Sequence, residues 1–134
     1  MSGELLKPTL YRREGSEADP GHPALLGGAC ACGHVFFPMQ TFGCELCGNS
    51  TLELRALTGR GRLLASAQVH LYAGKHRQAP FTVGSIALED GPIVRTLLVE
   101  GPSYAPGDTV VTALVEVTDA EGNAKSDLRF ERAR

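Results

Sequence analysis

The four cysteines of this 134-residue chain form two close pairs, and their spacing constrains the fold more than any other feature. Cys30 and Cys32 are separated by one residue, Cys44 and Cys47 by two, and a glycine follows each pair. Two short thiol pairs of this kind supply the four ligands of a tetrahedral zinc site. The sequence therefore predicts a structural zinc ion held by these four cysteines.

The first thiol pair is one residue shorter than a Cys-x-x-Cys half-site. In an extended backbone the Cα atoms of Cys30 and Cys32 are roughly 6.6 Å apart, whereas two sulfurs on one zinc ion are about 3.8 Å apart. The two side chains must therefore lean together to share a metal. His34 is an alternative ligand, and two disulfides or four free thiols are the other interpretations. We favour zinc because nothing in the sequence suggests secretion.

Length and charge argue against several classes of protein. A chain of 134 residues fits one domain, or a metal-stapled subdomain followed by one small domain. The net charge is −2, with both signs mixed along the chain, which favours neither nucleic acid nor an anionic membrane surface. No stretch reaches the length of a membrane span, and the N-terminus lacks the pattern of a signal peptide. We expect a cytoplasmic chain with reduced cysteines.

The first part of the chain divides into an arm and the metal-binding module. Residues 1–24 are polar and contain three prolines, which predicts an extended arm ordered by a partner, or else a disordered tail. Residues 25–57 are expected to form the zinc-ribbon module. Large apolar side chains lie between its cysteines, at Phe36, Phe37, Met39 and Phe42. They pack beneath the zinc or, because so small a module buries little, contact a partner protein.

Residues 58–134 have the pattern of a small β barrel. Small or apolar residues alternate with polar ones over residues 65–72, which indicates a half-buried strand. Further strands are expected at 81–88, 93–99, 110–117 and 126–131. Asp90-Gly91 between the second and third strands is a hairpin signal. The predicted fold is mainly β, with an N-terminal four-cysteine zinc ribbon followed by a five-stranded OB-fold barrel.

Catalytic machinery is not evident in the sequence. With all thiols assigned to zinc, no cysteine remains as a nucleophile, and a four-thiolate site has no open position for a catalytic water. His70 lies on the polar face of a predicted strand, which is more typical of a surface residue than of a base. There is no Gly-x-Ser-x-Gly elbow and no glycine-rich phosphate loop. We expect no independent enzymatic activity.

Several motifs in a fixed order carry a resemblance to a known family. They are residues 32–38, 44–50, 59–66, 89–92, 104–110 and 128–130. Over roughly residues 20–134 the chain resembles zinc-ribbon plus OB-fold proteins, once grouped as a domain of unknown function, that act as small subunits beside thiolases and related acyl-CoA enzymes. It departs from them in its shorter first thiol pair and in a weak N-terminal helical segment.

The resemblance implies a noncatalytic accessory subunit in a heteromeric complex. A thiolase-like subunit carries the chemistry, and this chain docks on it and helps to bind or enclose an acyl-CoA thioester at the shared interface. Small subunits of thiolases that act on aromatic β-keto acyl-CoA compounds in aromatic degradation look like close relatives. The alternatives are a partner of an acyl-CoA aldolase and a nucleic-acid-binding protein. The latter is disfavoured by the few aromatic residues outside the zinc module.

A basic loop is the candidate CoA site within this resemblance. Lys75 and Arg77 lie between the first two predicted strands of the barrel, where OB folds place recognition loops. Their side chains could pair with the phosphates of CoA. A solvated hairpin tip is the alternative interpretation.

Overall fold

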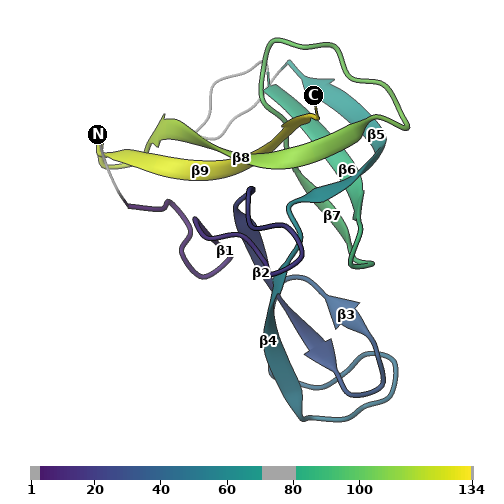
Figure 1. Cartoon of the computed structure of the whole chain (residues 1–134). Helices are drawn as coiled ribbons and strands as arrows, with labels where there is room; N and C mark the ends of the chain where they lie inside the picture. Colours follow the sequence, from purple (N-terminus) through teal and green to yellow (C-terminus); the bar gives the residue numbers. More distant parts are fainter. Residues whose placement is uncertain (1–3, 71–80, 134) are drawn as a thin grey trace.

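The computed structural model describes residues 4–70 and 81–133, and all regular structure within these ranges is β. A four-stranded sheet comes first and a five-stranded sheet follows (Figure 1). The predicted fold class is confirmed, because a ribbon that carries the four cysteines precedes a curled five-stranded sheet. The ranges named above contain no helix that is long and apolar enough to cross a membrane.

The ribbon sheet is built around one central strand. Its members are β1 (Tyr11–Arg12), β2 (Ala24–Cys30), β3 (Val35–Phe36) and β4 (Leu52–Leu57). The other three strands all pair antiparallel with β2. A Cβ atom on Gly27 would collide with the carbonyl oxygen of Phe36 and with the side chain of Leu57. Glycine therefore allows the neighbouring strands β3 and β4 to approach β2 closely at this position.

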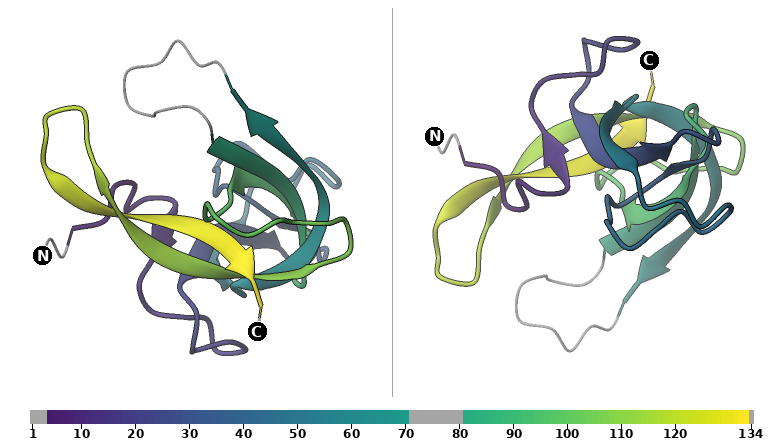
Figure 2. Two further views of the ribbon diagram at one scale, coloured as in Figure 1. Left: turned by 90° about the horizontal axis from the view of Figure 1, so that it is seen from above. Right: turned by 90° about the horizontal axis from the view of Figure 1, so that it is seen from below.

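The second sheet curls into the barrel. Its members are β5 (Arg60–Val69), β6 (Phe81–Leu88), β7 (Ile93–Leu97), β8 (Thr109–Thr118) and β9 (Ala124–Arg132). The strand order is β7-β6-β5-β8-β9, with antiparallel neighbours. The two outer strands meet where Leu98 forms a parallel bridge with Phe130, and the N–H of Val99 donates to the carbonyl of Phe130 at 2.8 Å. The curl is visible from above and below (Figure 2).

One hydrophobic cluster joins the two sheets. Leu63, Ile86 and Phe130 of the barrel are fully buried, and Leu57 at the end of the ribbon strand β4 is buried in the same cluster. Burying a side chain of this size stabilises the folded state by about 1.5–3 kcal/mol. The base of the ribbon is therefore fixed to the barrel, and its cysteine loops project away from it (Figure 1).

The N-terminal arm is held by its own chain from Glu4 onward. The N–H of Leu6 donates to the carbonyl of Ser126 at 2.8 Å, and the N–H of Ser126 donates to the carbonyl of Glu4 at 2.9 Å. At the end of the arm, the hydroxyl of Thr112 donates to the carbonyl of Pro23 at 2.7 Å. The arm was expected to need a partner for its order, whereas β8 and β9 supply these contacts.

Candidate metal centre

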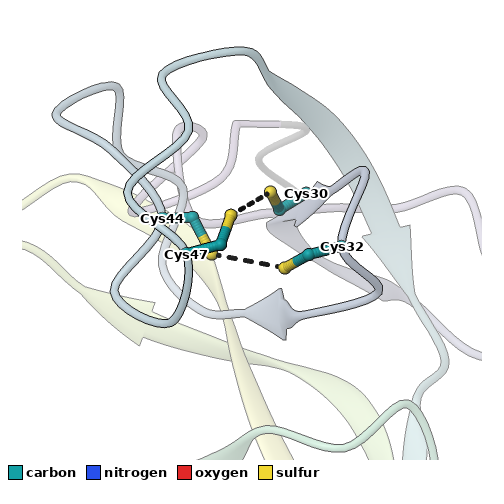
Figure 3. Close-up of side chains that lie close together, drawn as sticks. All are labelled: Cys30, Cys32, Cys44 and Cys47. Atoms are coloured by element: carbon teal, nitrogen blue, oxygen red, sulfur yellow. Dashed lines mark hydrogen bonds between the residues drawn. The ribbon is translucent and has the colours of Figure 1, made fainter.

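The sulfur atoms of the four cysteines meet at the far end of the ribbon. Cys30 ends β2 and Cys32 lies in the turn that follows it, whereas Cys44 and Cys47 come from the loop between β3 and β4. All four Sγ atoms lie within 4.8 Å of one another. Two contacts join the two loops, at 3.5 Å for Cys30–Cys47 and 3.6 Å for Cys32–Cys44 (Figure 3).

These distances fit a shared metal ion and do not fit disulfides. Two sulfurs on one tetrahedral zinc ion are about 3.8 Å apart, whereas disulfide-bonded sulfurs are about 2.05 Å apart. All four cysteines are free thiols. The Sγ atoms of Cys30 and Cys32 lie within 4.8 Å of each other, so the side chains of the one-residue pair lean together as the short spacing requires. The four thiols thus form a candidate metal site.

Tight turns at two glycines shape the thiol loops. Gly33 and Gly48 follow the two pairs and have φ angles of +99° and +79°, a backbone conformation that favours glycine. The N–H of Gly33 donates to the carbonyl of Cys30 at 2.9 Å, and that of Gly48 donates to the carbonyl of Cys44 at 2.8 Å. The glycine after each pair therefore turns the chain so that both thiols of a pair face one point.

The surroundings of Cys44 and Cys30 shift the pKa values of their thiols in opposite directions. The backbone N–H of Cys47, with that of Leu46, lowers the pKa of the Cys44 thiol to about 6. The backbone N–H of Cys32 acts in the same direction on Cys30, but burial and the neighbouring thiols oppose it, and the pKa of Cys30 rises to about 12. The backbone N–H groups therefore favour the thiolate form of Cys44, which is the form that binds a metal ion.

His34, the alternative ligand, lies beside the site and has another partner. Its Nε2 atom is 2.8 Å from Oε1 of Glu45, and its ring stacks on Phe36 with 5.8 Å between the ring centroids. The contact with Glu45 links the two thiol loops from outside. The donor atoms that cluster are those of the four cysteines.

The large apolar residues of the module are in different environments. Phe36 is only 7% exposed, and Phe37 is partly buried against the core cluster. Met39 is also half-buried, and its sulfur lies near the backbone of Gly28. Phe42 is 94% exposed. Of these residues, Phe42 offers the largest apolar surface to solvent.

Two of the other exposed apolar residues, which were not singled out from the sequence, lie close to the thiol loops. Leu46, between the second pair of cysteines, is 72% exposed, and Ile93 at the start of β7 is 66% exposed. Both line a groove of about 660 Å³ between the thiol loops and the turn that joins β6 to β7, with Glu45 and Asp90 in the same lining. The position of Leu46 inside a Cys-x-x-Cys loop was a usable signal, because such a loop turns its sulfurs inward and the intervening residues outward.

The basic loop between the first two strands of the barrel is the predicted CoA site. Lys75 and Arg77 lie outside the described residues.

The fold and the site together define a four-cysteine ribbon joined to an OB-type barrel. No family model matches the chain. A DUF35 domain-containing scaffold protein of Pyrococcus furiosus is 30% identical to it over 77 residues, which are 57% of this chain and 56% of that protein. The chain thus matches just over half the length of this relative.

A solved structure described as Ltp2-ChsH2(DUF35) aldolase has a similar fold. The TM-score is 0.66 with 23% sequence identity, over 83% of this chain and 86% of that one. This likeness extends the shared architecture to most of the chain.

Proposed function

We propose that this chain is a DUF35-type accessory subunit that docks on the catalytic subunit of an acyl-CoA enzyme complex. The observation that carries this proposal is the sequence similarity to a scaffold protein, in a chain whose ribbon projects from its barrel. The sequence resemblance favours a thiolase-type partner that acts on an aromatic β-keto acyl-CoA. The name of the solved structure favours an aldolase-type partner, which is the second candidate.

The metal of the ribbon is, in this proposal, zinc with a structural role. Four thiolates suit zinc, and a four-thiolate site leaves no position for a catalytic water. Zinc would bind Cys30, Cys32, Cys44 and Cys47 and join the two loops that carry these thiols. The ion would thereby keep the exposed tip of the ribbon rigid enough to dock.

The docking surface comprises three exposed apolar residues, Phe42, Leu46 and Ile93. Leu46 and Ile93 border the same groove, and Phe42 lies in the same loop of the ribbon as Leu46. A few large apolar groups often dominate the energy of an interface, and each contributes about 1.5–3 kcal/mol when fully buried. Phe36, Phe37 and Met39 would support this surface from inside the ribbon.

The partner is tested by recovering the tagged chain from its native cells and identifying bound proteins by mass spectrometry. We expect a stoichiometric thiolase-like or aldolase-like polypeptide, whose identity selects between the two chemistries. A Phe42→Ser/Leu46→Ser variant should weaken this association at least a hundredfold. Leu64→Ser is the matched control, because Leu64 is also exposed (43%) but lies on β5. A chain recovered alone, or with nucleic acid, would refute the accessory role.

CoA binding is proposed for Lys75 and Arg77 in the assembled complex. Basic side chains pair with phosphates, and arginine adds bidentate hydrogen bonds. A Lys75→Ala/Arg77→Ala complex should bind acyl-CoA more weakly while it still assembles. An unchanged affinity would exclude this loop as the CoA site.

A further inference from the structure

The seam of the barrel contains a cavity away from the cysteines. Within the described part of the chain, β7 and β9 share a single bridge, from Leu98 to Phe130. Beside that bridge lies a cavity of about 260 Å³, with β6 and β7 on one side and β9 on the other. The arm and the base of the ribbon complete its wall through Leu10, Tyr11 and Leu25. We call this space the seam cavity.

The inner wall of the seam cavity is formed by buried apolar side chains. Val94, Leu97, Leu128 and Phe130 line it, and each is at most 8% exposed. Pockets for small molecules are mostly apolar, with a few polar groups, and start near 300 Å³. The seam cavity lies just below this size, so it suits a ligand of about ten non-hydrogen atoms or fewer.

The rim of the cavity carries two basic side chains from different parts of the chain. Lys7 and Arg95 both line the cavity and are exposed. Neither side chain forms an ion pair or hydrogen bond within residues 4–70 and 81–133. Because they reach the same opening from the arm and from β7, they would both attract a negatively charged group there.

Asp127 is the one acidic residue in the lining, and its carboxylate has a hydrogen-bond donor and a cation beside it. Asp127 is 8% exposed, and its Oδ1 accepts a hydrogen bond of 2.8 Å from the hydroxyl of Tyr11. Its Oδ2 lies 3.6 Å from Nε of Arg129, a buried nitrogen without a hydrogen-bond partner. Burial, and then Asp127, raise the pKa of Tyr11, so the phenol stays neutral. The lining therefore presents a net positive charge.

We propose that the seam cavity binds a small anion with an apolar body, such as a medium-chain carboxylate. The apolar body occupies the space between β7 and β9, and Lys7 and Arg95 hold the anionic head at the rim. This site requires neither a metal nor a partner subunit, so it goes beyond the proposed accessory role and can be tested on the chain alone.

The test is a titration of the purified 134-residue chain with octanoate, followed by methyl NMR. We expect saturable shifts of the methyl groups of Leu10, Val83 and Leu97, which line the cavity, and none for Leu54 on the ribbon. Acetate, which has the head without the body, and octylamine, which has the body with a cation, should bind at least tenfold more weakly than octanoate.

Charge variants locate the head group. Lys7→Gln/Arg95→Gln should weaken octanoate binding about tenfold, because each exposed charge contributes modestly. Arg62→Gln removes another exposed arginine on β5 and should leave the affinity unchanged. These residues are exposed, so all variants should keep the methyl spectrum of the folded chain. Absence of saturable binding, shifts outside the cavity, or equal affinity for octylamine would overturn the proposal.

Discussion

The substitution Tyr11→Phe tests how much the phenol of Tyr11 contributes to fixing the arm to the barrel. The hydroxyl of Tyr11, which is 3% exposed, donates to Oδ1 of Asp127 at 2.8 Å and accepts from the N–H of Lys7 at 3.1 Å. Phenylalanine keeps the ring and removes both hydrogen bonds, together with a longer contact of 3.3 Å from the hydroxyl to the carbonyl of Ser126. Among the described residues, the ion pair that Asp127 then retains is the one with Nε of Arg129, at 3.6 Å.

The expected loss of stability follows from the charge of the Asp127 carboxylate. A hydrogen bond to a charged group stabilises a protein by about 1.5–3 kcal/mol. The N–H of Lys7 lies at an exposed position and can bond to water instead, so its loss adds little. We therefore expect Tyr11→Phe to lower the free energy of unfolding by about 2–3 kcal/mol. With a typical urea m value this is a shift of the midpoint by about 1–1.5 M.

The measurement is urea unfolding at neutral pH and constant zinc, with Tyr104→Phe as the matched control. The hydroxyl of Tyr104 donates to the carbonyl of Val99 at 2.7 Å, a neutral and half-buried hydrogen bond. Its loss should cost only about 1 kcal/mol. If Tyr11→Phe cost no more than Tyr104→Phe, the charged hydrogen bond would not fix the arm.

Three further predictions concern pH, the metal and backbone packing. Burial and Asp127 raise the pKa of Tyr11, so the neutral phenol contributes fully to stability below about pH 10, and this contribution is lost as the pH rises above that value. In urea unfolding at alkaline pH, Tyr11→Phe should therefore lose less stability than the parent chain. Elemental analysis should find one zinc per chain in the parent and in His34→Ala, but much less in Cys32→Ser; zinc loss in His34→Ala would contradict a four-thiolate site. Gly27→Ala should destabilise the chain by about 1–3 kcal/mol in thermal unfolding, because its Cβ would collide with neighbouring strands. Gly21→Ala, with open space around it, should be nearly neutral, and equal effects of the two substitutions would count against close strand packing.

Much of the barrel was predictable because its strands are marked locally. The apolar run at residues 81–88 coincides with β6, and the turn at Asp90-Gly91 joins β6 to β7 as expected. The start of β5 was missed, since the structure begins the strand at Arg60, where Gly61 and Leu63 alternate with exposed arginines. The ribbon strand β4 was also missed, although Leu52 and Leu54 alternate with charged residues.

The candidate metal site was visible in the sequence because its ligands are close neighbours along the chain. Two thiols separated by one or two residues must lie near each other in any conformation, and two such pairs define a metal site with few alternatives. Which sulfurs contact each other across the loops, Cys30 with Cys47 and Cys32 with Cys44, is a property of the folded ribbon. The same holds for the burial of Phe36 and the exposure of Phe42, which belong to the same apolar set in the sequence.

The sequence by itself determined the class of the fold and the thiol cluster, because strand alternation and cysteine spacing act over a few residues. The tertiary structure decided where the arm lies and that a cavity opens at the seam of the barrel. Tyr11 and Asp127 are 116 residues apart, and no local pattern relates a phenol in a polar arm to a carboxylate in the last strand. Their contact exists because closing the barrel brings β9 against the arm, where a buried carboxylate needs a hydrogen-bond donor.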